Sequence, residues 1–450
     1  MGKNTRQGRV EEVIERFTEQ LRRELGDDRA TLDEIEERVE RVGRQIMKKL
    51  EERLVEERTK RDRPNRVECS CGARASYKDQ ASRSIVTSHG SVCFRRPCYW
   101  CPSCKKSIAP LDEELGIRGS TSTRVRVWSV CLCGQLPFSQ SQSTLELLTG
   151  VCLSASTLER ITVAVGASLQ NERHTQAALH QAGEPLTMSS PFEEELCRLY
   201  VTMDGSFVPV RDEWKKDRSL GALSLRWNEC KLGVVYQAQV DQAGRDSGVK
   251  RKAYTATLQG VETFAPMLSA LAHKHGQCQA KEVLVLGDGA PWIWNLANER
   301  FPGAVQVLDF FHACQHLADY ADARFGAGTK QSQEWLAARK EELKTQNPMV
   351  VIKEIASWLP APLESWDMRN RTFKYFLDNL QRMDYKRLIE KGYHIGSGVV
   401  EAGCKHAIGQ RLDQAGMHWR PETAEAIAAI RAAQCSTNNT DIARHCQWAA

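Results

Sequence analysis

Residues 281–294, KEVLVLGDGAPWIW, contain the pattern that decides the fold. An apolar, β-branched run ends at a Gly-Asp288-Gly turn, and a segment that favours a helix follows. A short buried run of this kind is typical of a strand that delivers the next side chain to the open edge of a sheet. Residues 199–210, LYVTMDGSFVPV, repeat the arrangement around Asp204. The two stretches therefore predict two strands, each with an aspartate at its end.

The remaining elements of this region are predicted from apolar periodicity. Between the two aspartates lie two strand-like runs and an amphipathic helix, at 223–240, 251–258 and 262–276. After Asp288 come a helix, a strand and the start of a long helix, at 292–301, 304–310 and from His312. The order predicts an α/β fold with a mixed five-stranded sheet flanked by helices. Three antiparallel strands are followed by parallel strands, which right-handed helical crossovers connect.

A third acid, Glu401, lies in residues 394–405, HIGSGVVEAGCK, where a predicted helix follows a glycine-rich turn. Mg²⁺ prefers hard oxygen ligands, binds a few carboxylates and keeps positions for water and phosphate oxygens. Asp204, Asp288 and Glu401 together therefore predict a metal-dependent phosphoryl-transfer site. Each acid alone has a structural interpretation too, because an Asp-Gly pair is first of all a turn signal.

Four stretches of the chain resemble the RNase H-like DDE transposases of bacterial insertion sequences, most closely the Kra-type group with an N-terminal zinc ribbon. They are 96–117 (RPCYWCPSCKKSIAPLDEELGI), 201–205 (VTMDG), 287–317 (GDGAPWIWNLANERFPGAVQVLDFFHACQHL) and 396–419 (GSGVVEAGCKHAIGQRLDQAGMHW). The resemblance extends from about residue 64 to residue 433. It implies that Asp204, Asp288 and Glu401 are the catalytic triad and hold Mg²⁺ or Mn²⁺. Two such ions, about 3.5 to 4 Å apart, would support strand nicking and transfer of the freed 3′ end.

Two features near the second acid leave alternatives open. Asp309 also ends a strand and is a competing candidate for the second acid, but its bulky neighbours favour Asp288, which the flanking glycines open to phosphate and metal. Asp309 then supports the site without binding the metal, through contacts that position the metal ligands. His312 and His316 have the helical spacing of a zinc pair. The glutamate of a metalloprotease is missing between them, so a buried or DNA-facing role is favoured.

Paired cysteines predict a structural zinc site in the first third of the chain. Cys69 and Cys71 precede a glycine, and Cys101 and Cys104 flank a Pro-Ser pair, with strand-like sequence between the two pairs. This is the pattern of a zinc ribbon. The first pair is spaced C-x-C rather than C-x-x-C, so the nearby Cys93 and Cys98 are alternative ligands. The other cysteines, including Cys131 and Cys133, are typical of buried residues in a reducing compartment.

Residues 137–169 predict a helix-turn-helix, with one helix at 141–148 and a second beginning near Ala155. The exposed candidates for the major groove are Ser156, Thr157, Glu159 and Arg160. An ordinary helical hairpin fits the spacing equally well. Near the last acid, the resemblance implies DNA contacts from Arg411, His418 and Trp419, although a buried tryptophan is the commoner outcome. Asp413 stands where the family leads us to expect a basic residue.

Composition and charge complete the predicted organisation. The first 63 residues show helical periodicity broken at 26–28, which predicts a helical arm that either packs on its own chain or forms a coiled coil and a homo-oligomer. A net charge of +5 over 450 residues requires any DNA-binding surface to be local. No apolar run could span a membrane, so we expect a cytoplasmic, nucleoid-associated protein. The predicted divisions are 1–63 arm, 64–118 zinc ribbon, 119–185 helix-turn-helix, 186–317 with 393–435 catalytic core, 318–392 helical insertion and 436–450 tail.

The sequence therefore predicts a transposase that binds double-stranded DNA at transposon ends and at a target. Two other classes of protein stay open. One is a DNA-binding regulator whose sheet domain no longer cuts, and the other is a structure-specific nuclease on the same fold. The nuclease would share the metal chemistry and would differ only in using water as its nucleophile.

Overall fold

The computed structural model describes residues 11–12, 14–19, 22–23, 30–60, 63–187, 196–211, 226–359, 363–437 and 440–448. The chain divides into two compact units, one of 1–128 with 142–154 and 450, the other of 129–141 with 155–449. The predicted break in the helical arm at 26–28 lies outside the described residues. Within the described ranges, no helix combines the length and hydrophobicity needed to cross a membrane.

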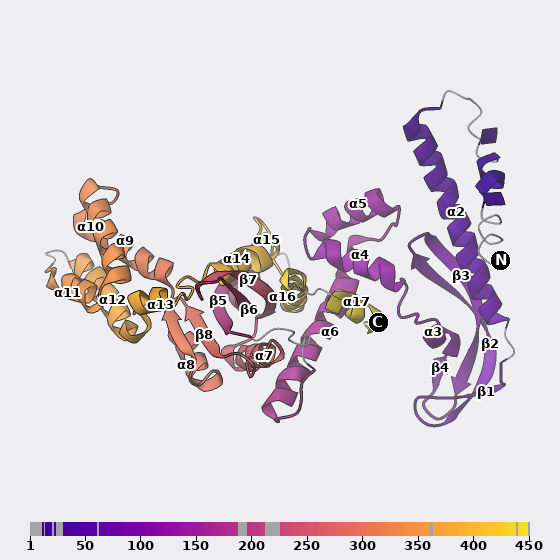
Figure 1. The fold of residues 1–450 in the computed structure, drawn as a ribbon. Helices are drawn as coiled ribbons and strands as arrows, with labels where there is room; N and C mark the ends of the chain where they lie inside the picture. Colours follow the sequence, from indigo (N-terminus) through magenta and orange to yellow (C-terminus); the bar gives the residue numbers. More distant parts are fainter. Residues whose placement is uncertain are drawn as a thin grey trace, which may run out of the picture. The chain divides into compact units, whose positions relative to one another are not determined.

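The first unit is built on a four-stranded antiparallel sheet in the order β1-β2-β3-β4. A 28-residue helix, α2, precedes it, and a capping box made by Thr31 and Glu34 starts that helix. Helix α2 packs along β3 (Figure 1). The elements are α2 (Leu32–Thr59), β1 (Arg66–Glu68), β2 (Arg74–Thr87), β3 (Gly90–Cys101), β4 (Lys106–Ile108) and α3 (Pro110–Glu114).

Three helices follow in sequence: α4 (Thr123–Cys133), α5 (Phe138–Thr149) and α6 (Ala155–Gln181). Gly150 ends α5 with a positive φ of 64°, which glycine adopts without strain. The second predicted helix of the helix-turn-helix therefore begins at the expected residue, Ala155, and the first begins three residues earlier than expected. Whether this pair of helices binds DNA stays a prediction.

The second unit contains the predicted mixed sheet, in the order β7-β6-β5-β8-β9. Strands β5, β6 and β7 pair antiparallel, and β5, β8 and β9 pair parallel. The prediction of three antiparallel strands followed by parallel ones is confirmed. The strands and the helices between them are β5 (Arg198–Val210), β6 (Arg226–Val240), β7 (Asp246–Thr257), α7 (Val261–Lys274), β8 (Glu282–Gly287), α8 (Pro291–Arg300) and β9 (Val305–Leu308).

Helices cover both faces of this sheet (Figure 1). On one face, a Cβ at Gly233 of β6 would come within 3.0 Å of Phe264 and Leu268 of α7, so that helix lies directly on the strand. On the other face, Gly403 of α14 lies against Leu232, the next residue of β6. Since successive side chains of a strand point to opposite faces, α7 and α14 enclose the sheet between them.

The chain from β9 to α14 is helical, as predicted for the insertion. It contains α9 (Phe310–Phe325), α10 (Lys330–Thr345), α11 (Met349–Ser357), α12 (Leu363–Asp378), a 3₁₀ turn (Leu380–Arg382) and α13 (Tyr385–Glu390). Then follow α14 (Gly398–Gly403), a π-helical turn (Cys404–Gly409), α15 (Gln410–Leu412), α16 (Pro421–Cys435) and α17 (Thr440–Trp448). The sequence of the predicted tail, 436–450, does not predict a helix, yet α17 forms there.

Candidate active site and cysteine cluster

The sheet register places the first two acids side by side where the pairing of β5 with β8 ends. The prediction that Asp204 ends its strand is wrong, because β5 continues past it to Val210 along β6. Parallel pairing of β5 with β8 joins Thr202 to Leu286, and Asp204 and Asp288 come two residues further along their strands. Parallel strands that pair in register bring their carboxyl ends to the same edge of the sheet. The two aspartates are therefore neighbours at that edge, 84 positions apart in the sequence.

Asp204 lies on the face of the sheet that α14 covers. In the antiparallel pairing of β5 with β6, Asp204 is opposite Leu232, and the side chain of Leu232 contacts Gly403 of α14. The backbone N–H of Gly205 donates to Asp204 Oδ1 at 2.7 Å. Partial burial raises the pKa of Asp204, and the negative charge of Asp288 raises it further, while the Gly205 N–H and the Cys404 thiol lower it. Two carboxylates therefore repel each other in a half-buried position, which a cation would relieve.

Asp288 is held by the turn that follows β8. The N–H of Ala290 donates to Asp288 Oδ1 at 2.9 Å, and the hydroxyl of Tyr375 in α12 donates to the Asp288 carbonyl at 2.7 Å. Gly289 has a φ of 104°, and a Cβ there would lie 2.6 Å from the Tyr375 ring. The glycine is therefore required both by backbone conformation and by close approach of the insertion.

Glu401 lies on α14, the helix that packs on β5 and β6. Its carboxylate is half-exposed and forms an ion pair with Lys405 at 2.8 Å, between side chains that are 48% and 72% exposed. The thiol of Cys404 lies near two of the acids. Burial is the main cause that raises its pKa, and the negative charges of Asp204 and Glu401 raise it further. A π-helical turn follows α14 directly. Such turns frequently occur at functional sites.

The structure thus brings Asp204 and Asp288 together and places Glu401 on the helix above them. Among the described residues, the three carboxylates do not form a closed group of ligand atoms around one point. The Glu401 carboxylate accepts a hydrogen bond from Lys405.

Asp309 has a different environment from the other two aspartates. It is 1% exposed, and its Oδ1 accepts from the N–H groups of Phe311 at 2.6 Å and His312 at 2.9 Å, which caps α9. Its Oδ2 accepts from both the N–H and the hydroxyl of Ser397, in the turn before α14. Every oxygen of Asp309 is therefore used to join the end of β9 to the turn that carries Glu401.

The two histidines of α9 take separate roles. His312 is 40% exposed on its side chain and lies 3.9 Å from Asp309 Oδ1. His316 stacks on Tyr375 with ring centroids 3.8 Å apart, and burial lowers its pKa. Within the described chain, the pair belongs to no group of side chains that could share one ion.

The four predicted cysteines meet at one end of the smaller sheet. Their sulfur atoms all lie within 4.8 Å of one another, with Cys69 and Cys104 3.6 Å apart and Cys71 and Cys101 3.6 Å apart. A tetrahedral site with Zn–S bonds of about 2.3 Å separates its sulfurs by about 3.8 Å. The group could therefore hold a zinc ion.

Two tight turns position the cysteines. Gly72, with a φ of 82°, turns the chain after β1, and Lys105, with a φ of 54°, turns it before β4. Backbone N–H groups of the second turn, chiefly that of Cys104, lower the pKa of Cys101 to about 7. The alternative ligands lie elsewhere, since Cys93 is exposed and Cys98 is buried beside Arg96.

The predicted DNA contacts divide into accessible and buried residues. At the start of α6, Ser156 and Arg160 are exposed and Thr157 is half-buried. Arg411 is only 1% exposed: its Nε donates to the Cys133 carbonyl at 2.8 Å, and its guanidinium stacks on Trp419 at 4.7 Å.

The Trp419 side chain is 6% exposed, and its Nε1 donates to the Leu412 carbonyl at 2.9 Å. His418 is half-buried. Arg411 and Trp419 thus stabilise the core of the second unit and are not accessible to DNA in this structure, which corrects the expectation for these two residues.

Comparison with known proteins gives the chain a family. A model of an uncharacterised protein family, UPF0236, matches residues 25–448. The chain belongs to the UPF0236 family. Within the family it is similar to the "UPF0236 protein in vanSb 3'region" of Streptococcus gallolyticus, with 21% identity over 360 residues, 78% of this chain and 72% of that protein.

A solved structure, the "Drosophila P element transposase strand transfer complex", is similar with a TM-score of 0.26 and 14% identity. The match covers 67% of this chain and 66% of that chain, slightly less than two thirds of its length. A similarity at this level carries no argument about fold or activity.

Proposed function

We propose that this UPF0236 protein is a DNA transposase that cuts and joins DNA strands by metal-dependent phosphoryl transfer, on an RNase H-like core. One observation carries the proposal. Asp204 of β5 and Asp288, directly after β8, lie next to each other where the parallel pairing of these two strands ends, and the helix bearing Glu401 packs on β5 and β6. The three acids come from three distant parts of the chain.

The donor set fits Mg²⁺ or Mn²⁺. Carboxylate oxygens are the ligands these ions prefer, and the mutual repulsion of Asp204 and Asp288 is the kind of strain that a divalent cation offsets. When bound, such ions would activate water or a 3′-hydroxyl and stabilise the leaving oxygen. Asp204, Asp288 and Glu401 would hold them.

The residues of the chain position these ligands in different ways. The N–H of Gly205 fixes Asp204, and the N–H of Ala290 fixes Asp288. Glu401 would leave Lys405 to bind metal. Exposed ion pairs of this type contribute about 0 to 1 kcal/mol, so the exchange costs little. Asp204 must lose its proton to act as a ligand, and in the metal-free protein its raised pKa opposes that loss.

Binding of the DNA substrate is assigned to other parts of the chain. A structural zinc ion at Cys69, Cys71, Cys101 and Cys104 would stabilise the small sheet. The exposed start of α6, with Ser156, Thr157 and Arg160, would contact the transposon ends as the second helix of a helix-turn-helix. We further propose that the protein acts as a homo-oligomer.

A cleavage and strand-transfer assay tests the proposal. Duplexes with the native element's ends are incubated with Mg²⁺ or Mn²⁺ and with wild type, Asp288→Ala or Asp309→Ala. We expect wild type to cut and join, Asp288→Ala to be inactive, and Asp309→Ala to retain measurable cutting per folded molecule, as quantified by circular dichroism.

Other outcomes would favour other functions. Cutting without joining would favour a nuclease, and end binding without cutting would favour a regulator. An inactive but folded Asp309→Ala beside an active Asp288→Ala would mean that the second acid is misassigned.

A further inference from the structure

A polar pocket lies at the opposite end of β9 from the acids. It has a volume of about 500 Å³ and opens beside Val305, the first residue of the strand. Four residue steps of about 3.3 Å separate Val305 from Asp309, so about 13 Å of strand lies between the pocket and the acid edge. The pocket is lined by Asn298, Ala304, Val305, Gln306, Gln381, Arg382, Asp384, Arg387, Leu388, Lys391 and Tyr393.

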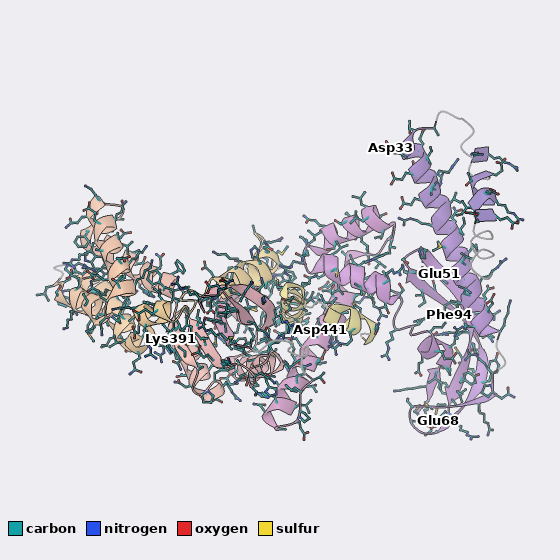
Figure 2. All side chains as sticks on the ribbon, viewed as in Figure 1. Asp33, Glu51, Glu68, Phe94, Lys391 and Asp441 are labelled. Carbon is teal, nitrogen blue, oxygen red and sulfur yellow. The ribbon has the colours of Figure 1, made fainter. Side chains whose placement is uncertain are left out.

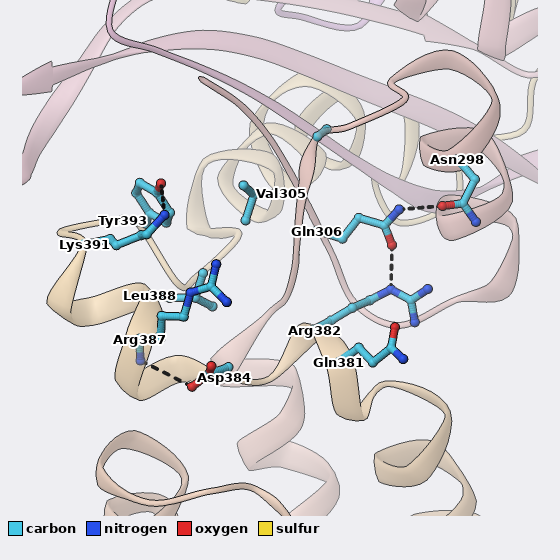
Figure 3. Close-up of a pocket in the computed structure, with 11 residues that line it drawn as sticks. Asn298, Val305, Gln306, Gln381, Arg382, Asp384, Arg387, Leu388, Lys391 and Tyr393 are labelled. Carbon is cyan, nitrogen blue, oxygen red and sulfur yellow. Dashed lines mark hydrogen bonds between the residues drawn. The ribbon is translucent and has the colours of Figure 1, made fainter. Parts of the chain in front are cut away.

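Positive charge dominates the lining. Arg382, Arg387 and Lys391 face a single carboxylate, that of Asp384, which leaves an excess of two positive charges. In the described part of the chain, none of the three cations has a carboxylate within ion-pair distance. Figure 3 shows the Arg387 guanidinium between Lys391 and Tyr393 on one side and Arg382 on the other. An anion entering the pocket would meet cations from both sides.

Arg382 is held in place before any ligand binds. Its Nε donates to Gln306 Oε1 at 2.7 Å, and its Nη1 donates to the Asp378 carbonyl at 3.1 Å. The guanidinium also lies over the Trp294 ring, 4.5 Å from its centroid. Gln306 is itself fixed by a hydrogen bond to Asn298 at 2.7 Å. A guanidinium oriented in this way binds an oxyanion with little loss of side-chain entropy.

We propose that this pocket binds a phosphate group. Guanidinium groups match the geometry of phosphate oxygens, and two excess positive charges match either a phosphate monoester, which carries about −1.5 to −2 at neutral pH, or two phosphodiester groups of a nucleic-acid backbone with one charge each. Amide groups of Asn298 and Gln381 add hydrogen-bonding capacity to the lining, whereas that of Gln306 is already bound to Arg382 and Asn298. The volume exceeds that of phosphate alone, so the group is carried by a larger molecule. That molecule is either a free phosphorylated compound or a nucleic-acid backbone.

The site stands apart from the proposed catalytic acids and does not depend on them. Binding can therefore be measured without divalent metal, where no cleavage occurs. The test variant is Arg387→Gln with Lys391→Gln, since both side chains are exposed and neither belongs to the core. The matched control is Lys386→Gln, an exposed lysine on the same helix, α13, that does not line the pocket.

Two probes distinguish the sources of the phosphate. Inorganic phosphate is titrated against the thermal unfolding temperature at constant ionic strength, and a fluorescent DNA duplex is titrated by anisotropy. We expect phosphate to raise the unfolding temperature of wild type and of Lys386→Gln, and its apparent affinity to fall at least about tenfold in the double variant.

The DNA titration then assigns the ligand. A parallel tenfold loss of DNA affinity in the double variant alone would indicate the backbone as the source, and unchanged DNA affinity would indicate a free phosphorylated compound. The proposal would be overturned if the double variant bound phosphate and DNA as tightly as wild type does. Neither result depends on whether the protein cuts DNA.

Discussion

The cysteine cluster and the acid edge are two candidate metal sites built on opposite principles. The four sulfurs come from two turns of one small sheet and already lie within 4.8 Å of one another. The acids come from two strands and a distant helix, and Glu401 is bound to Lys405 instead of its partners. A closed thiolate site suits a structural ion, whereas a site with an uncommitted ligand suits one that must admit substrate. The difference predicts that the two sites can be disabled independently.

The largest effect is expected from Glu401→Gln. The amide keeps the size of the side chain but loses the negative charge, so we expect strand cleavage to fall by at least about 10³-fold. Folding should change by less than about 0.5 kcal/mol, because the ion pair lost is exposed. Cleavage rates and thermal unfolding measure the two effects.

Lys405→Gln is the matched control for that variant. It breaks the same ion pair and leaves the carboxylate free, so we expect it to keep cleavage within a few-fold of wild type. Equal loss of cleavage in both variants would show that the ion pair, and not the carboxylate, matters.

Cys101→Ser should have the converse effect. Removing one of four thiolates would release zinc and destabilise the small sheet by several kcal/mol, since metal binding and folding are coupled in such sites. Metal analysis and unfolding curves measure both quantities. The exposed Cys93, replaced by Ser, serves as the control and should leave zinc content unchanged. Retention of zinc by Cys101→Ser would contradict the assignment of the four cysteines as a zinc site.

A smaller effect is expected from Asp309→Asn, because Asp309 has a structural role, unlike the other two aspartates. In Asp309→Asn one oxygen becomes an amide that cannot accept from Phe311 and His312 or from Ser397. We expect destabilisation of about 2 to 4 kcal/mol in urea or guanidinium titrations. An unchanged stability would contradict its role in joining β9 to the turn before α14.

Asp204→Asn should act in the opposite direction in metal-free protein. The raised pKa of Asp204 means that its protonated form favours folding. That contribution is complete below about pH 3.9, the ordinary value for Asp, and is lost as pH rises through the folded-state pKa. We therefore expect the variant to be more stable than wild type by on the order of 1 kcal/mol at pH 7, with the difference vanishing in acid. In unfolding curves at several pH values, a difference that stays constant would contradict the raised pKa of Asp204, to which burial contributes first and the charge of Asp288 adds.

The sequence was sufficient for the sheet because each strand carries its own signal. The run 283–286 is continuously apolar, as a parallel strand buried on both faces requires, and the run 199–203 of β5 is likewise buried. Asp288 follows its strand as the local pattern predicts, whereas β5 continues past Asp204 to Val210, so the predicted strand end there is wrong. The chain belongs to the UPF0236 family, and the mixed sheet flanked by helices is confirmed, whereas the resemblance to insertion-sequence transposases and the catalytic roles stay proposals.

Contacts between distant segments could not be predicted. The hydrogen bonds from Ser397 that occupy Asp309 span 88 residues, and the hydroxyl that fixes Asp288 comes from Tyr375, 87 residues later. The family resemblance implied a DNA contact for Arg411, yet tertiary stacking on Trp419 buries it. By contrast, the Glu401–Lys405 pair has helical i, i+4 spacing and was available from sequence.

The most direct test of the account is calorimetric titration of zinc-loaded protein with Mn²⁺, for wild type, Asp288→Asn and Cys93→Ser. We predict that wild type and Cys93→Ser bind Mn²⁺ alike, and that Asp288→Asn binds it at least about tenfold more weakly with its zinc content unchanged. Mn²⁺ binding that is unaffected by Asp288→Asn would contradict a metal site at the acid edge, and with it the proposed chemistry.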